Sequence, residues 1–249
     1  MIEQCTFPSL VEPYAQALRQ AVEFILSRTA PVGILACGTI LRGNPDPASD
    51  LDLYVIHRQP YRQRIQKFFN GVPAEIFINP PGQVKRYLAE EQAEHRPITA
   101  HMLATGFPVL EIDPVMAELR QEALQSLANP PAPSPESLLF RRYMAANWLE
   151  DAADLAPRDE ATANLFLSQA VLEMTCFNFI AAQKHLPRNK ELITATEALD
   201  PELGALLRRF YLSADCATRL ALAYQVADRT TQLYGFCEWE ATPESIGET

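Results

Sequence analysis

The sequence lacks the features that mark secreted, zinc-binding or membrane-spanning proteins. Its five cysteines are scattered and include no C-x-x-C pair, which argues against a disulfide framework and a zinc site. No apolar run approaches the roughly 20 residues that a membrane helix needs. The opening residues, MIEQCTFPSL, lack the basic start and apolar core of a signal peptide. We therefore expect a cytoplasmic protein with no membrane partner.

Positive charge is also scarce. The chain has 21 lysines and arginines against 31 aspartates and glutamates, so its formal net charge is −10. This balance argues against tight non-specific binding to nucleic acid, because such binding depends on neutralising phosphates. With 249 residues, 48% of them apolar, the chain can form one large domain or two modest ones around a sizeable core.

Helical and strand-like patterns alternate over residues 1–128. Apolar residues recur at helical spacing in some segments, whereas short apolar or alternating runs bounded by glycine and proline indicate strands. The expected strands are 32–37, 51–57, 72–78 and 107–112, and the expected helices are 9–28, 61–70, 82–94, 97–105 and 114–128. We predict an α/β (α+β) domain here, with a short mixed sheet and helices packed on one side.

A proline-rich segment divides the chain. Residues 129–136, NPPAPSPE, include four prolines, which cannot sit inside a helix or a central strand. We interpret this segment as a linker between a domain over 1–128 and an all-α helical bundle over 137–238. The expected helices of the bundle are 137–156, 160–185, 188–199, 201–212 and 214–235. Residues 239–249 are expected to form a loose tail.

Three carboxylates lie on, or directly before, the expected strands of the first domain. Asp50 and Asp52 open the strand 51–57, and side chains two positions apart in a strand point to the same face. Two adjacent carboxylates repel each other, so the pair indicates a cation site, and Mg²⁺ binds such oxygens readily. If the strands are neighbours, Glu75 can face the pair. The three carboxylates can then hold one or two Mg²⁺ ions that bind a nucleotide's phosphates.

Candidate phosphate-binding residues surround the first strand end. Gly38 allows close backbone approach to a phosphate, and Thr39 supplies a hydroxyl and an N–H donor. Arg42 and Ser49 lie in the loop that leads to Asp50, where they can reach phosphate oxygens.

Together these residues resemble the signature of the polymerase-β-like nucleotidyltransferase superfamily. That pattern is Gly-Ser, a loop, then Asp-x-Asp, with a third acidic residue on a later strand. Here Gly38-Thr39, Asp50-x-Asp52 and Glu75 stand at these positions. The helical domain that follows makes the layout similar to that of the kanamycin-type aminoglycoside nucleotidyltransferases.

The resemblance, which is good over residues 30–80, implies an activity. A nucleoside monophosphate, AMP where ATP is the donor, would move from Mg²⁺–NTP to a hydroxyl of a small-molecule acceptor such as an aminoglycoside. Pyrophosphate would be released. The nucleotide would lie on the first domain and the acceptor against the second, and the kanamycin-type enzymes imply a homodimer. By the same resemblance, Asp50, Asp52 and Glu75 are the metal ligands, and Gly38, Thr39, Arg42 and Ser49 bind the triphosphate.

Three positions depart from the family pattern. Thr39 replaces the usual serine but keeps a hydroxyl, and Leu41 stands where many members have a second glycine. In the kanamycin-type enzymes a glutamate of the first helix of the helical domain deprotonates the acceptor. That position falls near Asn147, which cannot act as a base. Glu150, one turn further on, is therefore our candidate general base.

Two other classes of function stay open. One is a protein- or RNA-modifying transferase, as in antitoxins built on the same core. The fused helical domain argues against it, because those cores usually stand apart from their helical partner. The other is a non-catalytic nucleotide-binding regulator on a degenerate scaffold. The three carboxylates argue against this interpretation. The asparagine near the expected position of the general base argues for it.

Overall fold

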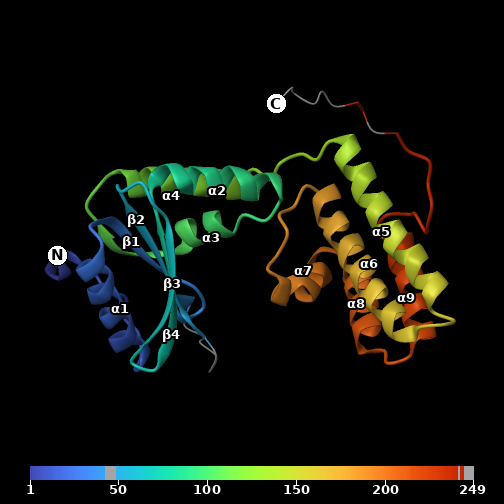
Figure 1. Ribbon diagram of the computed structural model, residues 1–249, viewed down its shortest axis with the longest axis horizontal. Coiled ribbons are helices and arrows are strands. Elements are labelled where there is room, and N and C mark those ends of the chain that lie inside the picture. The colour runs from blue at the N-terminus through green and yellow to red at the C-terminus, as the bar shows by residue number, and fades with distance from the viewer. Residues whose placement is uncertain (43–48, 241, 244–249) are drawn as a thin grey trace. The chain divides into compact units, whose positions relative to one another are not determined.

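The computed structural model describes residues 1–42, 49–240 and 242–243 of the protein (Figure 1). The chain divides into two compact units, Met1–Pro130 and Pro131–Thr249, and the division lies inside the proline-rich segment. Part of the predicted tail, at residues 241 and 244–249, lies outside the described residues.

The first unit is built on one mixed sheet. Among the described residues, five strands form this sheet in the order β3-β4-β2-β1-β5. β2 and β4 run parallel, and the other neighbouring strands run antiparallel, which confirms the predicted mixed sheet. The strands are β1 (Pro31–Cys37), β2 (Leu51–His57), β3 (Gln63–Phe69), β4 (Val72–Asn79) and β5 (Phe107–Glu111). The main helices are α1 (Tyr14–Arg28), α2 (Pro81–Ala93), α3 (Ile98–Thr105) and α4 (Val115–Ala128).

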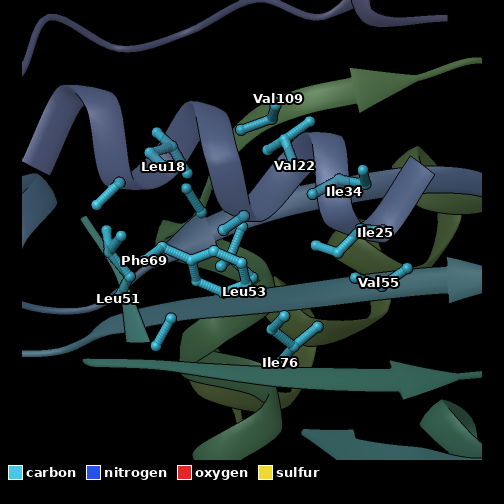
Figure 2. Packing of buried hydrophobic residues seen from close by; sticks show 14 of the residues in the cluster. Leu18, Val22, Ile25, Ile34, Leu51, Leu53, Val55, Phe69, Ile76 and Val109 are labelled. Carbon is cyan, nitrogen blue, oxygen red and sulfur yellow. The ribbon is translucent and has the colours of Figure 1, made fainter. Parts of the chain in front are cut away.

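Helices cover both faces of this sheet, so the prediction of helices on one side is wrong. On one face α1 packs Leu18, Val22 and Ile25 against strand residues such as Leu53 and Val55 (Figure 2). On the other face, α2, α3 and α4 pack against a second set of strand residues. These are Leu35, Cys37, Tyr54 and Ile56. The near-continuous apolar runs of β1 and β2 already indicate that both faces of the sheet are covered, because strands buried on both faces do not alternate apolar and polar residues.

The predicted helix over 61–70 is also wrong, since this segment contains the strand β3. β3 and β4 form a hairpin whose turn is Asn70-Gly71, with φ angles of 47° and 77°. Two successive positive φ angles are typical of the tight turn that Asn-Gly favours. The exposed charged residues of this segment belong to an edge strand, where they discourage pairing with other chains.

The first predicted helix is shorter than expected, because α1 begins at Tyr14 and not at residue 9. Pro13 precedes it, and a proline disfavours helical geometry in the residue before it.

The second unit is a helical bundle, as predicted. Its helices are α5 (Pro135–Leu155), α6 (Glu160–Ala181), α7 (Leu192–Leu199), α8 (Pro201–Leu212) and α9 (Cys216–Arg229). Apolar residues of α5, α6, α8 and α9 form its core, among them Leu149, Leu167, Met174, Phe210 and Val226. α5 begins within the predicted linker, because Ser134 caps it and a proline is tolerated in the first turn.

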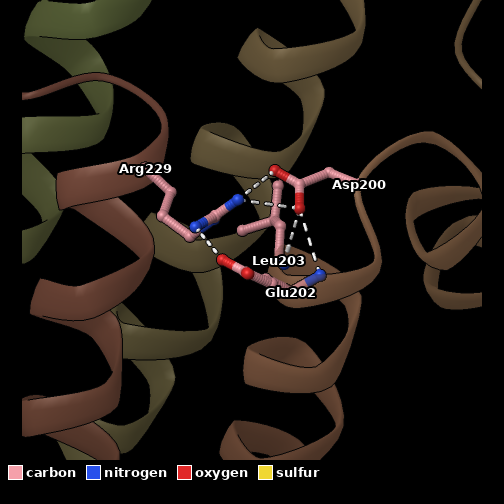
Figure 3. Close-up of polar contacts among 4 residues, drawn as sticks. All are labelled: Asp200, Glu202, Leu203 and Arg229. Carbon is pink, nitrogen blue, oxygen red and sulfur yellow. Dashed lines mark hydrogen bonds and ion pairs between the residues drawn. The ribbon is translucent and has the colours of Figure 1, made fainter.

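Capping side chains fix several helix starts in this bundle. Asp200 accepts hydrogen bonds from the backbone N–H groups of Glu202 and Leu203 at 3.1 and 3.0 Å, so it caps α8 (Figure 3). Arg229 of α9 donates to both oxygens of Asp200 and also pairs with Glu202. Burial raises the pKa of Asp200, but these hydrogen bonds outweigh it and hold the pKa below its ordinary value. The contact ties the start of α8 to the end of α9.

Across the described ranges, no helix combines the length and the apolar character that crossing a membrane requires.

Candidate metal centre

Three carboxylates converge where β2 and β4 run side by side. Parallel pairing places Asp52 directly opposite Glu75, and Asp50 lies one position before β2 begins. One oxygen from each of the three carboxylates lies within 4.8 Å of the others. Asp50 is exposed, whereas Asp52 and Glu75 are half-buried. The residues predicted as metal ligands are therefore close enough to share one cation.

Gly38 lies against this carboxylate cluster. It follows β1, and the antiparallel register places Asp52 beside the preceding residue, Cys37. Its φ of +93° is a backbone conformation that residues with a Cβ rarely adopt. A Cβ on Gly38 would also lie only 2.8 Å from Oδ2 of Asp52. The backbone conformation therefore favours glycine here, and any larger residue would displace the carboxylate of Asp52.

Two hydroxyls flank the cluster. The Oγ1 atom of Thr39 and the Oγ atom of Ser49 are 3.3 Å apart, within hydrogen-bonding distance. Ser49 is 7% exposed and Thr39 is half-buried. These hydroxyls therefore lie next to Gly38 and Asp50 in the chain and contact each other in space. Arg42 ends a short 3-10 helix (Ile40–Arg42), but its side chain and residues 43–48 lie outside what the structure describes.

The edge strand β3 contributes two residues that the sequence analysis missed. The Nε2 atom of Gln66 donates to Oε1 of Glu75 at 3.0 Å, and the guanidinium of Arg64 forms an ion pair with the same oxygen. The hydrogen bond to Glu75 raises the pKa of Arg64 above its ordinary value. The wrong helix assignment hid both residues. Reading Asn70-Gly71 as a hairpin turn would have placed Gln66 opposite Glu75.

Cys37 is buried behind the cluster and donates a hydrogen bond from Sγ to the carbonyl of Met102 at 3.3 Å. Burial, and secondly the charge of Asp52, raise its pKa to about 12. A thiol this far from ionisation is no nucleophile at neutral pH. The cysteine is therefore part of the packing between the sheet and the helices that cover this face.

The predicted general base, Glu150, belongs to α5 of the second unit. It lines a hollow of about 350 Å³ together with Tyr143, Asn147 and the segment 235–239, all of the same unit. Asn147, near which the sequence resemblance places a glutamate in the kanamycin-type enzymes, donates a hydrogen bond to Asp151 at 3.3 Å. The assignment of Glu150 as a base stays a prediction.

Comparisons with known proteins identify the fold. No family model matches the sequence, and no curated protein matches it. The structure is similar to the crystal structure of a nucleotidyltransferase-like protein from Exiguobacterium sibiricum 255-15. The TM-score is 0.54 at 17% sequence identity, over 87% of this chain and 74% of the other. The protein therefore has a nucleotidyltransferase fold, in which the mixed α/β unit is followed by a helical region.

Proposed function

We propose that the protein is a nucleotidyltransferase. It would move a nucleoside monophosphate, AMP where ATP is the donor, from Mg²⁺–NTP to a hydroxyl of a small-molecule acceptor. The observation that carries the proposal is the convergence of Asp50, Asp52 and Glu75 beside Gly38. This convergence occurs on a fold shared with a nucleotidyltransferase-like protein.

The donor set fits Mg²⁺. Three carboxylate oxygens within 4.8 Å of one another provide hard, negatively charged ligands. Because Asp50 is exposed, one side of the cluster is open to water and to the phosphates of a nucleotide. A bound Mg²⁺ supplies charge stabilisation at the phosphates and favours ionisation of the acceptor hydroxyl.

We assign the metal-binding and phosphate-binding roles to the following residues. Asp50 and Asp52 would hold the cation and, through it, position the α-phosphate, and Glu75 would complete the ligand set. The Gly38 N–H and the hydroxyls of Thr39 and Ser49 donate to the triphosphate, with Arg42 as a further phosphate ligand.

The reaction itself is an in-line substitution at the α-phosphorus. The acceptor oxygen forms a bond to phosphorus while the bond to pyrophosphate breaks. The hydroxyl proton passes to a general base, for which Glu150 is the candidate.

The charge of the second unit favours a cationic acceptor. Residues 129–249 contain 10 basic and 17 acidic residues, a net charge of −7, compared with −10 for the whole chain. Negative potential raises the local concentration of a positively charged acceptor. An aminoglycoside-like amino sugar has this character, so this acceptor class is the first to test.

The test follows labelled ATP and the release of pyrophosphate with a panel of aminoglycosides, and separately with protein and RNA acceptors. We expect Mg²⁺-dependent transfer to a small molecule, abolished by Asp50→Asn and by Asp52→Asn. Glu111→Gln is a matched control, because Glu111 is an exposed carboxylate on β5, at the opposite edge of the sheet from β3. Retained activity in both aspartate variants would overturn the proposal. Label on protein or RNA would favour the antitoxin-type alternative.

A further inference from the structure

The carboxylate cluster already contains a cation supplied by the protein. In β3, Gln66 pairs with Glu75, and Arg64 lies two positions along the strand, so both side chains point to the face that carries Glu75. Arg64 and Gln66 contact the same atom, Oε1 of Glu75. A metal ion that takes Glu75 as a ligand therefore meets a carboxylate that already has two donors from β3.

The ion pair compensates a charge problem that the cluster has without a metal. Asp50, Asp52 and Glu75 place three negative charges within 4.8 Å, where they repel one another. The guanidinium of Arg64 offsets part of this charge. A divalent cation offers twice the charge and direct coordination, so it competes with Arg64 for the same carboxylate.

The ion pair is also suited to exchange. The side chain of Arg64 is 64% exposed, whereas that of Glu75 is 14% exposed. Because the guanidinium is open to water, solvent screens the pair and limits its contribution to stability, so a metal can displace it. The Cζ atom of Arg64 lies 5.1 Å from the centroid of the Phe77 ring, which can support the guanidinium once it leaves Glu75. A freed guanidinium next to the cluster presents a fork of donors that matches a phosphate.

We propose that Arg64 is the counter-ion of the carboxylate cluster in the metal-free protein. Metal binding displaces its guanidinium from Glu75 and frees it to bind the phosphates of the nucleotide. Arg64 thereby couples occupancy of the metal site to recognition of the nucleotide. This inference rests on the proposed function, because it requires a cation at the carboxylates and a nucleotide beside them.

The test uses two affinities that Arg64→Gln should change in opposite directions. Without nucleotide, loss of the competing charge should tighten Mn²⁺ binding, measured by electron paramagnetic resonance, by about twofold to fivefold, the range of an exposed ion pair. At saturating Mg²⁺, loss of the phosphate ligand should weaken ATP binding, measured by calorimetry, by a similar factor. A purely structural role would weaken both affinities together.

Two further variants separate charge from general damage. Lys67→Gln removes the same charge from the same strand, but Lys67 lies near Phe24 of α1, on the opposite face, and should change neither affinity. Arg64→Lys keeps the charge and should retain the Mn²⁺ affinity of the wild type. Thermal unfolding of each variant confirms that the fold is intact.

The outcomes distinguish this inference from the proposed function. Unchanged or weaker Mn²⁺ binding in Arg64→Gln overturns the inference, and so does Arg64→Lys behaving like Arg64→Gln. If the wild type binds neither Mn²⁺ nor Mg²⁺–ATP, the metal centre itself is wrong and the inference fails with it. Tighter Mn²⁺ binding together with weaker ATP binding in Arg64→Gln supports both the role of Arg64 and the proposed function.

Discussion

Replacing Gly38 with alanine tests the carboxylate cluster separately from the stability of the fold. The substitution adds one methyl group at the end of β1. That methyl would lie 2.8 Å from Oδ2 of Asp52, while the Cγ and Cβ atoms of Asp52 are farther away, at 3.6 and 3.7 Å. The carboxylate of Asp52 can therefore avoid the methyl group by rotating, which turns it away from its present position.

Two costs follow from this geometry. Holding an alanine at a φ of +93° costs about 1–2 kcal/mol of folding free energy, as for other residues forced into left-handed backbone. Rotating Asp52 also disturbs the ligand set. Changes that reorient a metal ligand typically weaken metal binding by about tenfold or more. We expect the same order of loss in Gly38→Ala.

The assay combines urea unfolding with Mn²⁺ titration, and Gly71→Ala is the matched control. Gly71 also has a positive φ, +77°, but a Cβ there would meet no atom within 4 Å. Gly71→Ala should therefore lose about 1–2 kcal/mol of stability and keep its metal affinity. If Gly38→Ala folds and binds Mn²⁺ as tightly as Gly71→Ala does, the reasoning about Asp52 is refuted.

Two further predictions concern the second unit, both measured by urea unfolding. Asp200→Ala removes the cap of α8 and the ion pair with Arg229 and should cost about 1–2 kcal/mol at neutral pH, whereas Asp200→Asn, which keeps a cap, should cost less. Folding lowers the pKa of Asp200, so its contribution to the free energy of unfolding is complete above its unfolded pKa and declines as the pH falls through its folded pKa. A difference in unfolding free energy between wild type and Asp200→Ala that stays constant across this pH range would contradict the assignment. Gly204→Ala should cost about 1–3 kcal/mol, because its Cβ would lie 2.7 Å from Cα of Glu197 and force α7 and α8 apart. Gly82→Ala, in open space in α2, is its control and should be neutral or stabilising, and equal effects of the two would contradict the packing argument.

The sequence predicted the parts of the fold whose signals are local. The apolar runs of β1 and β2 are continuous, and the prolines of 129–136 exclude regular structure in the middle of that segment. Asp50 and Asp52 are two positions apart, so their common face follows from strand geometry alone. The fold class and the convergence of these residues could therefore be predicted without coordinates.

The errors come from information that is not local. In residues 61–70 the spacing of charged residues fits the outer face of a helix, and only the Asn70-Gly71 turn distinguishes the hairpin. Arg64 therefore appeared as a solvent-facing residue, although it contacts Glu75. Hydrophobic periodicity predicts that α2, α3 and α4 are helices, but it does not say which face of the sheet each helix covers.

The most direct test of the account is Mg²⁺-dependent ATP binding measured by calorimetry. It compares the wild type, the Asp50→Asn/Asp52→Asn double variant and the Glu111→Gln control. We predict that the wild type and the control bind ATP only when Mg²⁺ is present, and that the double variant does not bind it. ATP binding that persists in the folded double variant, or that does not depend on Mg²⁺, would contradict the assignment of the nucleotide site to these carboxylates.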